Sequence, residues 1–143
     1  MQRTFLLVDD DIDDFNLLND AIVAADPTVR LFHITTESEI YSWFKENPTK
    51  TPELILLDIY DLGSFDGWEI LTRLKKQGAI ADIPVIIYTV DPTFEYDKLA
   101  GSAAVGILKK PITMAGMKAL AEMLVATRRE NWLETIRQFP EEL

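Results

Sequence analysis

The sequence predicts an α/β fold in which helices cover both faces of a parallel β-sheet. Five short apolar runs alternate with segments whose apolar residues recur at helical spacing, and this alternation is typical of βαβ units. Three of the runs consist almost entirely of Leu, Ile, Val and Phe, as expected of parallel strands that are buried on both faces. Because 143 residues is the length of one ordinary domain, we expect a single module over residues 1–143.

Five strands are expected from the apolar runs. They cover residues 4–8, 29–35, 54–57, 85–89 and 105–108. Strict alternation with helices and right-handed crossovers leaves few topologies open. Among these we expect the flavodoxin-like doubly wound arrangement, a five-stranded parallel sheet with the order 2-1-3-4-5.

The first two helices are identified by their apolar spacing and by their ends. Residues 11–25 carry apolar side chains at helical intervals, and Asp10 or Asp11 is placed to cap this helix and to interact with its positive N-terminal dipole. Residues 37–46 have an apolar inner face and are followed by Pro48, where a helix does not continue. Both helices are expected to pack on the sheet.

The remaining helices differ in length. A third is expected from residue 67 or 68 to about residue 77, and a short fourth over residues 93–100. The last begins after Pro111 and extends toward Ile136, so that its ~25 residues would be close to ~40 Å long. We expect the far end of this extended last helix to pack on another surface, and the alternative is that it folds back over its own sheet. The apolar side chains at that end favour a homodimer; they are Trp132, Leu133 and Ile136.

Charge and composition exclude several classes of function. With 24 acidic and 14 basic residues the net charge is -10, which repels a phosphate backbone, so we expect no DNA binding. No apolar run approaches the ~20 residues that span a bilayer, and the apolar run near the N-terminus is too short for a signal peptide. We therefore expect a cytoplasmic protein without a membrane partner.

Polar side chains follow four of the predicted strands at the point where each strand ends. Asp9 and Asp10 follow the first strand, Asp58 follows the third, Thr89 ends the fourth, and Lys110 follows the fifth. Because the carboxyl ends of parallel strands meet at one edge of a sheet, these side chains are expected to share one pocket. The three carboxylates would repel one another there, and a divalent cation would relieve that repulsion.

Mg²⁺ is the expected cofactor of this pocket because it prefers oxygen ligands and keeps several waters. We expect Asp10 and Asp58 to bind it directly and Asp9 to bind through water. The backbone carbonyl of Tyr60, two residues past Asp58, would complete the set. Since Asp9, Asp10 and Asp11 are consecutive, the sequence leaves open which two of them hold the metal.

A carboxylate oxygen can also attack phosphorus and form an acyl phosphate when charge on the phosphoryl group is neutralised. Asp58 is the expected nucleophile, with Mg²⁺, Lys110 and the Thr89 hydroxyl neutralising charge. Taken singly, each of these residues has an ordinary explanation, because aspartates favour turns and helix caps and most lysines are solvated. The ordered set at successive strand ends is what favours a functional site.

These motifs resemble the receiver domain of two-component response regulators. The resemblance rests on LLVDDD, LILLD, FDGWEIL, VIIYT and LKKP, and it covers residues from about 4 to about 125, which leaves a C-terminal extension over about 126–143. It implies that Asp58 accepts phosphate from a phosphohistidine on a sensor histidine kinase or phosphotransfer protein. It also implies that Asp9 and Asp10 hold Mg²⁺, that Thr89 follows the phosphate, and that Lys110 bridges to it.

The resemblance implies a signalling protein and not an enzyme. No output domain is expected after the receiver, so the signal would pass to a downstream protein target through protein contacts. The tail, with the sequence ENWLETIRQFP, resembles that of small stand-alone receivers that partner phytochrome-type histidine kinases.

Three departures from the family pattern keep an alternative open. The loop from Asp58 to the Asp-Gly turn is one residue longer than usual and carries Leu-Gly in place of the usual Leu-Pro or Met-Pro. Val90 stands where the family prefers a small residue. Ile107 replaces the aromatic residue that moves on activation, so that Tyr88 or Tyr96 would have to move in its place. The alternative is a receiver-like interaction module that works without phosphorylation. A Mg²⁺-dependent phosphohydrolase is a third hypothesis, but such enzymes place a second Asp where this chain has Tyr60.

Overall fold

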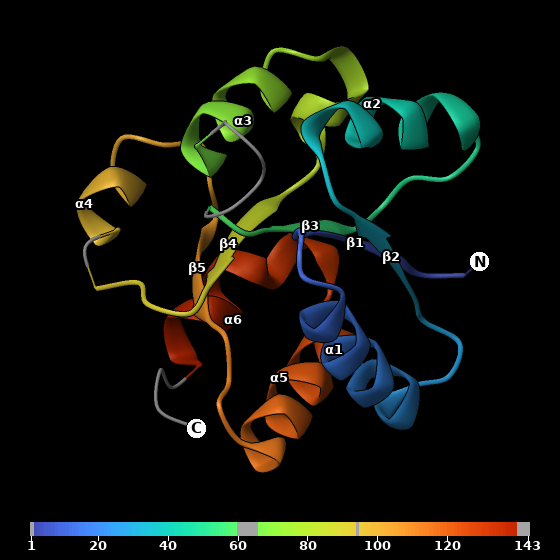
Figure 1. The fold of residues 1–143 in the computed structure, drawn as a ribbon, viewed down its shortest axis with the longest axis vertical. Coiled ribbons are helices and arrows are strands. Elements are labelled where there is room, and N and C mark those ends of the chain that lie inside the picture. The colour runs from blue at the N-terminus through green and yellow to red at the C-terminus, as the bar shows by residue number, and fades with distance from the viewer. Residues whose placement is uncertain (1, 60–65, 94, 140–143) are drawn as a thin grey trace.

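The computed structural model describes residues 2–59, 66–93 and 95–139, and Figure 1 presents the fold. Its centre is one parallel sheet of five strands with the order β2-β1-β3-β4-β5. The strands are β1 (Thr4–Val8), β2 (Arg30–Ile34), β3 (Leu54–Leu57), β4 (Val85–Thr89) and β5 (Gly106–Lys109). The predicted fold class and strand order are confirmed.

Helices connect the strands and cover both faces of the sheet (Figure 1). They are α1 (Ile12–Ala25), α2 (Glu37–Glu46), α3 (Gly67–Leu74), α4 (Tyr96–Leu99), α5 (Met114–Ala126) and α6 (Trp132–Gln138), with short 3-10 turns η1 (Gly78–Asp82) and η2 (Arg129–Asn131). Of the two residues considered as the cap of α1, the cap is Asp11, whose side chain accepts the N–H of Asp13. Within the described ranges, no helix has the length and apolar character needed to cross a membrane.

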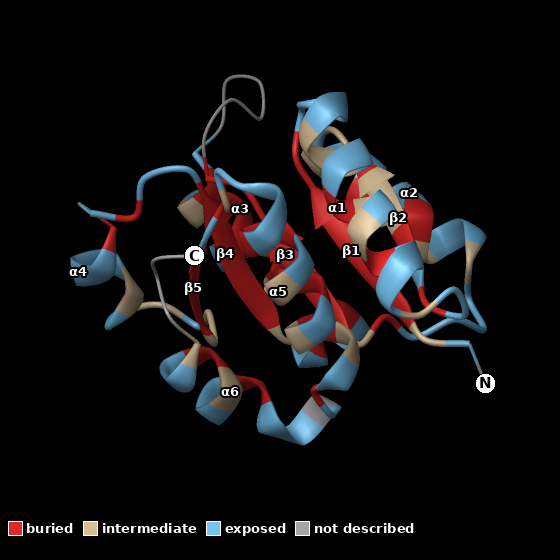
Figure 2. Ribbon diagram, turned by 90° about the horizontal axis from the view of Figure 1, so that it is seen from below, coloured by how far each residue is buried: buried red, intermediate tan, exposed pale blue. Residues whose placement is uncertain are grey.

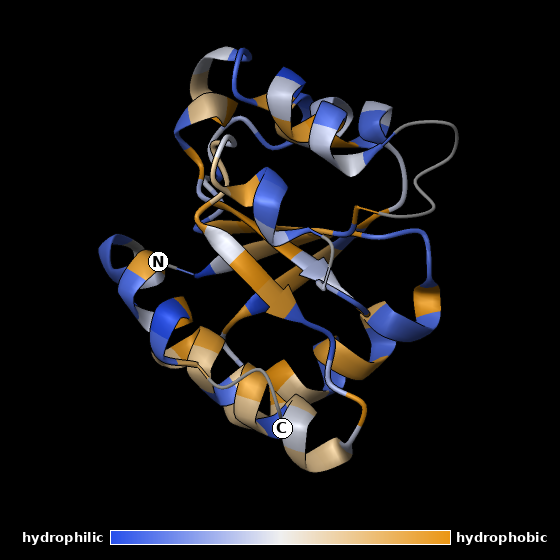
Figure 3. Cartoon of the chain, turned by 90° about the vertical axis from the view of Figure 1, so that its left-hand side faces the viewer, coloured by the Kyte–Doolittle hydropathy of each residue, from blue (hydrophilic) through white to orange (hydrophobic). Residues whose placement is uncertain are grey.

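Two hydrophobic clusters fill the space on either side of the sheet. The first lies between the sheet and α1, α5 and α6, and the second lies between the sheet and α2, α3 and α4. Every residue of β1, β3 and β4 is buried, which explains the nearly continuous apolar sequences of these strands. Figures 2 and 3 show this arrangement, with buried and apolar strands inside and exposed polar helix faces outside.

The expected extended last helix is wrong, because the chain forms two helices in place of one. Helix α5 ends at Ala126, and Thr127 and Arg128 adopt extended backbone angles before η2 and α6. The guanidinium of Arg3 donates hydrogen bonds to the carbonyl of Val125 in the last turn of α5 and to that of Thr127 just after it, the latter at 2.8 Å. A residue near the start of the chain thus satisfies two carbonyls at this helix end.

Helix α6 then folds back over the sheet of its own chain, which was the alternative to packing elsewhere. Trp132 is only 2% exposed and its ring meets the ring of Phe5 edge to face at 6.0 Å. Ile136 packs so closely on β5 that a Cβ atom at Gly106 would lie 2.9 Å from its Cγ2 atom. Trp132 and Ile136 are thus buried within their own chain and are not available to a dimer interface. Of the three residues that favoured a homodimer, only Leu133 is exposed.

Candidate functional site

The predicted convergence of strand ends is present around the ammonium group of Lys110. Lys110 Nζ lies 2.7 Å from Asp9 Oδ2 at the end of β1 and 2.8 Å from Asp58 Oδ2 at the end of β3. It also lies 2.7 Å from Asp14 Oδ2, in the first turn of α1. Lys110 itself directly follows β5, so three strand ends and one helix meet at this cation.

Asp9 is held by contacts on both its side chain and its backbone. Its side chain has no exposed surface, and its Oδ1 atom accepts the N–H of Asp11 at 2.9 Å. Its carbonyl oxygen lies 2.7 Å from Nε2 of His33, and since a carbonyl only accepts, Nε2 carries the hydrogen. The ring of His33 stacks on Phe15 of α1 at a centroid distance of 4.8 Å. The turn that carries the first acidic residues is therefore fixed from β2 and from α1.

Burial and charge act in opposite directions on this cluster. Burial raises the pKa of Asp9, and the hydrogen bond from Lys110 offsets only part of that effect. Burial alone would lower the pKa of Lys110, but its hydrogen bonds to the three aspartates reverse the direction and raise it. Burial also raises the pKa of Tyr88, whose ring centroid lies 5.6 Å from Lys110 Nζ. Lys110 is consequently a permanent cation among carboxylates.

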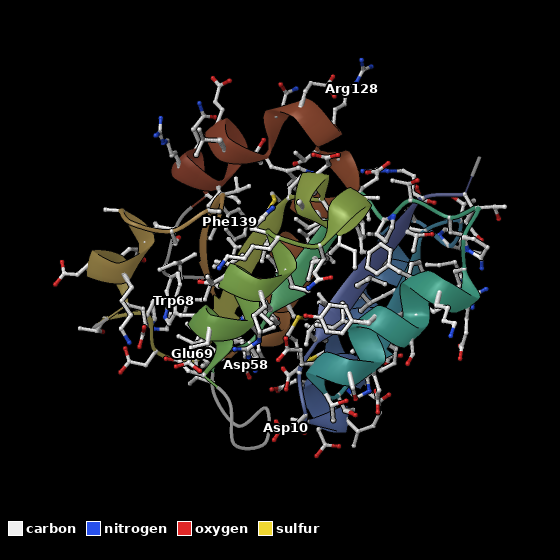
Figure 4. All side chains as sticks on the ribbon, turned by 90° about the horizontal axis from the view of Figure 1, so that it is seen from above. Asp10, Asp58, Trp68, Glu69, Arg128 and Phe139 are labelled. Carbon is white, nitrogen blue, oxygen red and sulfur yellow. The ribbon has the colours of Figure 1, made fainter. Side chains whose placement is uncertain are left out.

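The other predicted site residues are placed as follows. Thr89 ends β4 and is fully buried, and within the described part of the chain its Oγ1 atom has no hydrogen-bond partner. Asp10 is exposed, and Figure 4 shows it at the same end of the molecule as Asp58, opposite Arg128. Tyr60, whose carbonyl was expected to bind the metal, lies outside the described residues, as does most of the lengthened loop after Asp58.

Helix α3 begins directly against the backbone that carries Asp58. The side chain of Asp66 caps this helix by accepting the N–H of Trp68 at 2.9 Å. At the next position a Cβ atom on Gly67 would collide with Cα of Ile59 and would lie 2.9 Å from the carbonyl oxygen of Asp58. Only glycine fits this contact without a shift of the backbone. The Asp-Gly turn therefore sets how closely α3 approaches the site.

Two of the departures from the family pattern can be located. Val90 is 59% exposed, so its side chain points away from the core. Ile107 is buried in the cluster beneath α3 and α4. Of the two tyrosines considered in its place, Tyr88 is buried on the opposite face of the sheet, beside Met117, while Tyr96 is exposed.

One contact that the sequence did not indicate links α3 to the start of α4. The indole N–H of Trp68 donates to Oε2 of Glu95 at 2.7 Å, and the same oxygen lies 3.5 Å from Nζ of Lys98. Glu95 is only 5% exposed although it is a carboxylate. The segment after β4 is thereby tied to α3.

Sequence reasoning also missed Asp14 and His33. Asp14 lies in the first turn of α1, the helix that begins shortly after Asp9 at the edge of the site. This position was the available signal that its carboxylate could reach the site. His33 gave no signal, because its contact with Asp9 depends on the register in which β2 pairs with β1, and the sequence did not predict that register.

The donor set at this edge fits a hard divalent cation by its chemistry. Asp9, Asp10 and Asp58 supply carboxylate oxygens, and negative charge exceeds the single positive charge of Lys110. Among the residues the structure describes, no three such side chains converge as a ready metal site. The contacts of Lys110 with Asp9 and Asp58 explain this, because its ammonium lies between the carboxylates that a metal would bring together.

Comparison with known proteins agrees with this geometry. A family model described as the response regulator receiver domain matches residues 5–122. The chain is 26% identical over 136 residues to the cyclic di-GMP phosphodiesterase response regulator RpfG of Xanthomonas campestris pv. campestris (strain 8004). The matched part covers 93% of this chain and 34% of RpfG. The chain spans about a third of the length of the curated relatives it matches.

Solved structures resemble this one over nearly its whole length. The phosphorylated cyanobacterial phytochrome response regulator RcpA superimposes with a TM-score of 0.73 at 20% identity, covering 94% of this chain and 96% of RcpA. The Mn²⁺-bound form of response regulator Rcp1 superimposes with a TM-score of 0.70 at 22% identity, covering 93% of this chain and 96% of Rcp1. At these identities the likeness concerns the fold.

Proposed function

Since this chain belongs to the response regulator receiver domain family, we propose that it accepts a phosphoryl group on Asp58 in a two-component phosphorelay. The donor would be a phosphohistidine on a sensor histidine kinase or on a phosphotransfer protein. The observation that carries the proposal is the position of Asp58, whose carboxylate follows the central strand and lies 2.8 Å from a buried ammonium. Receiver family membership and this contact together favour phosphoryl transfer over other uses of an acidic pocket.

The proposed transfer is a displacement at phosphorus. An oxygen of Asp58 forms a P–O bond while the P–N bond to the donor histidine breaks, and the nitrogen keeps the electron pair. The carboxylate becomes an acyl phosphate with additional negative charge. Lys110 is already beside Asp58 and would hold one phosphoryl oxygen, and the buried hydroxyl of Thr89 has its hydrogen-bonding capacity left for another.

We propose Mg²⁺ as the cofactor. Asp10 and Asp58 would bind it directly, Asp9 would bind it through water, and the carbonyl of Tyr60 would complete the set. Both oxygens of Asp9 already accept hydrogen bonds, which supports an indirect role for this residue. When bound, the cation supplies neutralisation of charge on the phosphoryl group. The divalent cation in the related fold of Rcp1 supports this assignment.

The remaining parts of the proposal concern partners and setting. The chain would act in the cytoplasm as one receiver module and pass its signal to a downstream protein by contact, without binding DNA. We propose that the C-terminal extension is part of that module, and the packing of α6 on β5 supports this for the described residues up to 139. The likeness to RcpA supports a kinase of the phytochrome type as donor. A homodimer stays a prediction.

The test uses acetyl phosphate or beryllofluoride with Mg²⁺ on the intact chain. We expect a phosphorylated species by mass spectrometry, or a saturable beryllofluoride complex, that Asp58→Asn abolishes. Asp82→Asn is the matched control, because Asp82 is exposed and precedes β4 at the opposite edge of the sheet. Equal modification of wild type and Asp58→Asn would reject the assignment of Asp58.

The second candidate is a receiver-like module that binds its partner without phosphorylation. The three ion pairs of Lys110 favour it, because they occupy the cation that a phosphoryl group would need. In that case a partner recovered by the wild type would bind Asp58→Asn and Asp58→Glu with the same affinity. A partner that binds the wild type only after treatment with acetyl phosphate, and does not bind Asp58→Asn after the same treatment, would decide for the phosphoacceptor.

A further inference from the structure

The ammonium group of Lys110 has no donor left for a new ligand. A lysine carries three N–H donors, and three carboxylate oxygens lie 2.7, 2.7 and 2.8 Å from Nζ of Lys110. These oxygens belong to Asp9, Asp14 and Asp58. If Lys110 is to bind an oxygen of a phosphoryl group on Asp58, it must first release one of these three contacts.

The three contacts differ in what their release would cost. The side chain of Asp9 has no exposed surface, and an unpaired carboxylate there would be strongly unfavourable. Asp58 is the group that is modified, and its side chain is 10% exposed. Asp14 is 29% exposed, so water can replace Lys110 as its partner. Asp14 is therefore the contact that can be exchanged at the lowest cost.

The position of Asp14 in the fold lowers that cost further. It lies in the first turn of α1, where the free N–H groups and the helix dipole favour negative charge. A carboxylate released from Lys110 at this point keeps a favourable electrostatic environment. Asp58 has no such position, because it directly follows a strand, and Asp9 accepts the N–H of Asp11 but has no exposed surface through which water could replace Lys110.

We propose that Asp14 is a positioning residue that holds Lys110 before phosphorylation and releases it to the phosphoryl group afterwards. The inference rests on the proposed function of Asp58. Asp14 then competes with the phosphoryl group for the same ammonium, so its carboxylate weakens the binding of phosphoryl analogues. Removing the carboxylate leaves Lys110 with a free donor before the analogue arrives.

The experiment measures the affinity of the intact chain for beryllofluoride in the presence of Mg²⁺. We expect Asp14→Asn to bind about fivefold more tightly than the wild type, the ratio appropriate to one partly exposed ion pair. Asp13→Asn is the matched control, because it removes the same charge one residue away on an exposed part of the same helix turn. Asp14→Glu keeps the carboxylate, and its affinity should stay within about twofold of the wild type.

A purely structural role for Asp14 predicts the opposite sign. Loss of a structural contact lowers both the stability of the fold and the affinity of the site, whereas the exchange proposed for Asp14 lowers the stability and raises the affinity. Urea unfolding of the same variants therefore accompanies the binding measurement. An affinity of Asp14→Asn equal to that of Asp13→Asn, or weaker, overturns the role of Asp14. Beryllofluoride binding that is absent in the wild type or retained in Asp58→Asn instead overturns the proposed function and the inference with it.

Discussion

Replacing Lys110 with Met tests whether this cation stabilises the fold as well as the site. Met keeps a long apolar stem, so little packing is lost, but the ammonium between the carboxylates is removed. Breaking a buried ion pair by deleting one partner typically costs about 3–5 kcal/mol because the other charge stays buried. Asp9 is fully buried and Asp58 nearly so, while Asp14 is partly hydrated. We therefore expect a loss near the lower end, about 3 kcal/mol.

The loss should depend on pH with a definite sign. Burial already raises the pKa of Asp9 above its ordinary value of 3.8, and without Lys110 this pKa rises further. Between pH 3.8 and the raised value the folded protein binds a proton that the unfolded chain does not, so stability increases as the pH falls toward 3.8. Lys110→Met should accordingly regain part of its lost stability when the pH is lowered from about 7.5 to about 5.

The assay is urea unfolding followed by circular dichroism, in EDTA, at both pH values. The neighbouring Lys109→Met is the matched control, because Lys109 is exposed at the last position of β5. We expect this control to change the free energy of unfolding by less than about 0.5 kcal/mol. A loss in Lys110→Met below about 1 kcal/mol, or one that is the same at both pH values, would refute the reasoning from buried charge.

Three further predictions concern the packing beside this site, the C-terminal helix and the ion pair between α2 and α3. Gly67→Ala should lower the free energy of unfolding by about 1–3 kcal/mol, because the added Cβ atom would collide with the backbone of Ile59. An unchanged midpoint of unfolding would contradict the close contact between α3 and this backbone. Trp132→Ala should lower the free energy of unfolding by about 3–5 kcal/mol, because Trp132 is buried, and Leu133→Ala should lower it by less than about 0.5 kcal/mol, because Leu133 is exposed. Equal losses for the two variants in urea unfolding would show that α6 does not pack in the core. The hydrogen bond from Arg73 lowers the pKa of Glu37 below 4.5, so its contribution is present above pH 4.5 and disappears as the pH falls through the lowered value. Thermal unfolding of Glu37→Gln should therefore differ from the wild type at neutral pH and converge with it in acid.

The parts of the fold that the sequence predicted best are those whose signal is local. The bounds of β1, β3, β4 and α2 agree with the prediction, because uninterrupted apolar runs and a well-placed cap mark them. Helix α3 ends at Leu74, earlier than expected, and a turn follows in which Gly78 has a φ of 47°. Helix α4 is shorter than expected because the side chain of Asp91 accepts the N–H of Thr93, which favours a turn over a helix start.

The break after α5 could not be predicted because its cause is not local. Val125 and Thr127 flank Ala126 and only weakly disfavour a helix, and neither Gly nor Pro is present to require an end there. The helix ends where Arg3 reaches its last carbonyls while paired with Glu53. These partners lie more than 70 residues away in sequence, so only the assembled fold brings them to this point.

The site was predictable to the extent that parallel topology determines it. Residues that follow strands must meet at one edge, which is why Asp9, Asp58 and Lys110 could be grouped before their distances were known. The signal for Asp14 was weaker, because a position in the first turn of α1 brings a residue near the edge, but whether its side chain reaches the site depends on the rotation of α1 about its axis. That rotation is set by packing against α5, not by the sequence of α1 alone.

The saturated Lys110 changes how the site should be understood. In a pocket with free donors, a metal or phosphoryl group adds new contacts, and its binding free energy measures those contacts. Under the exchange proposed for Asp14, a phosphoryl group on Asp58 would replace an ion pair that Lys110 already makes, so the measured affinity would be a difference between two sets of contacts. The same exchange would remove a contact between Lys110 and α1, since Asp14 belongs to that helix. Under this proposal, the effect of a phosphoryl group on Asp58 would therefore be transmitted to α1 by loss of one contact.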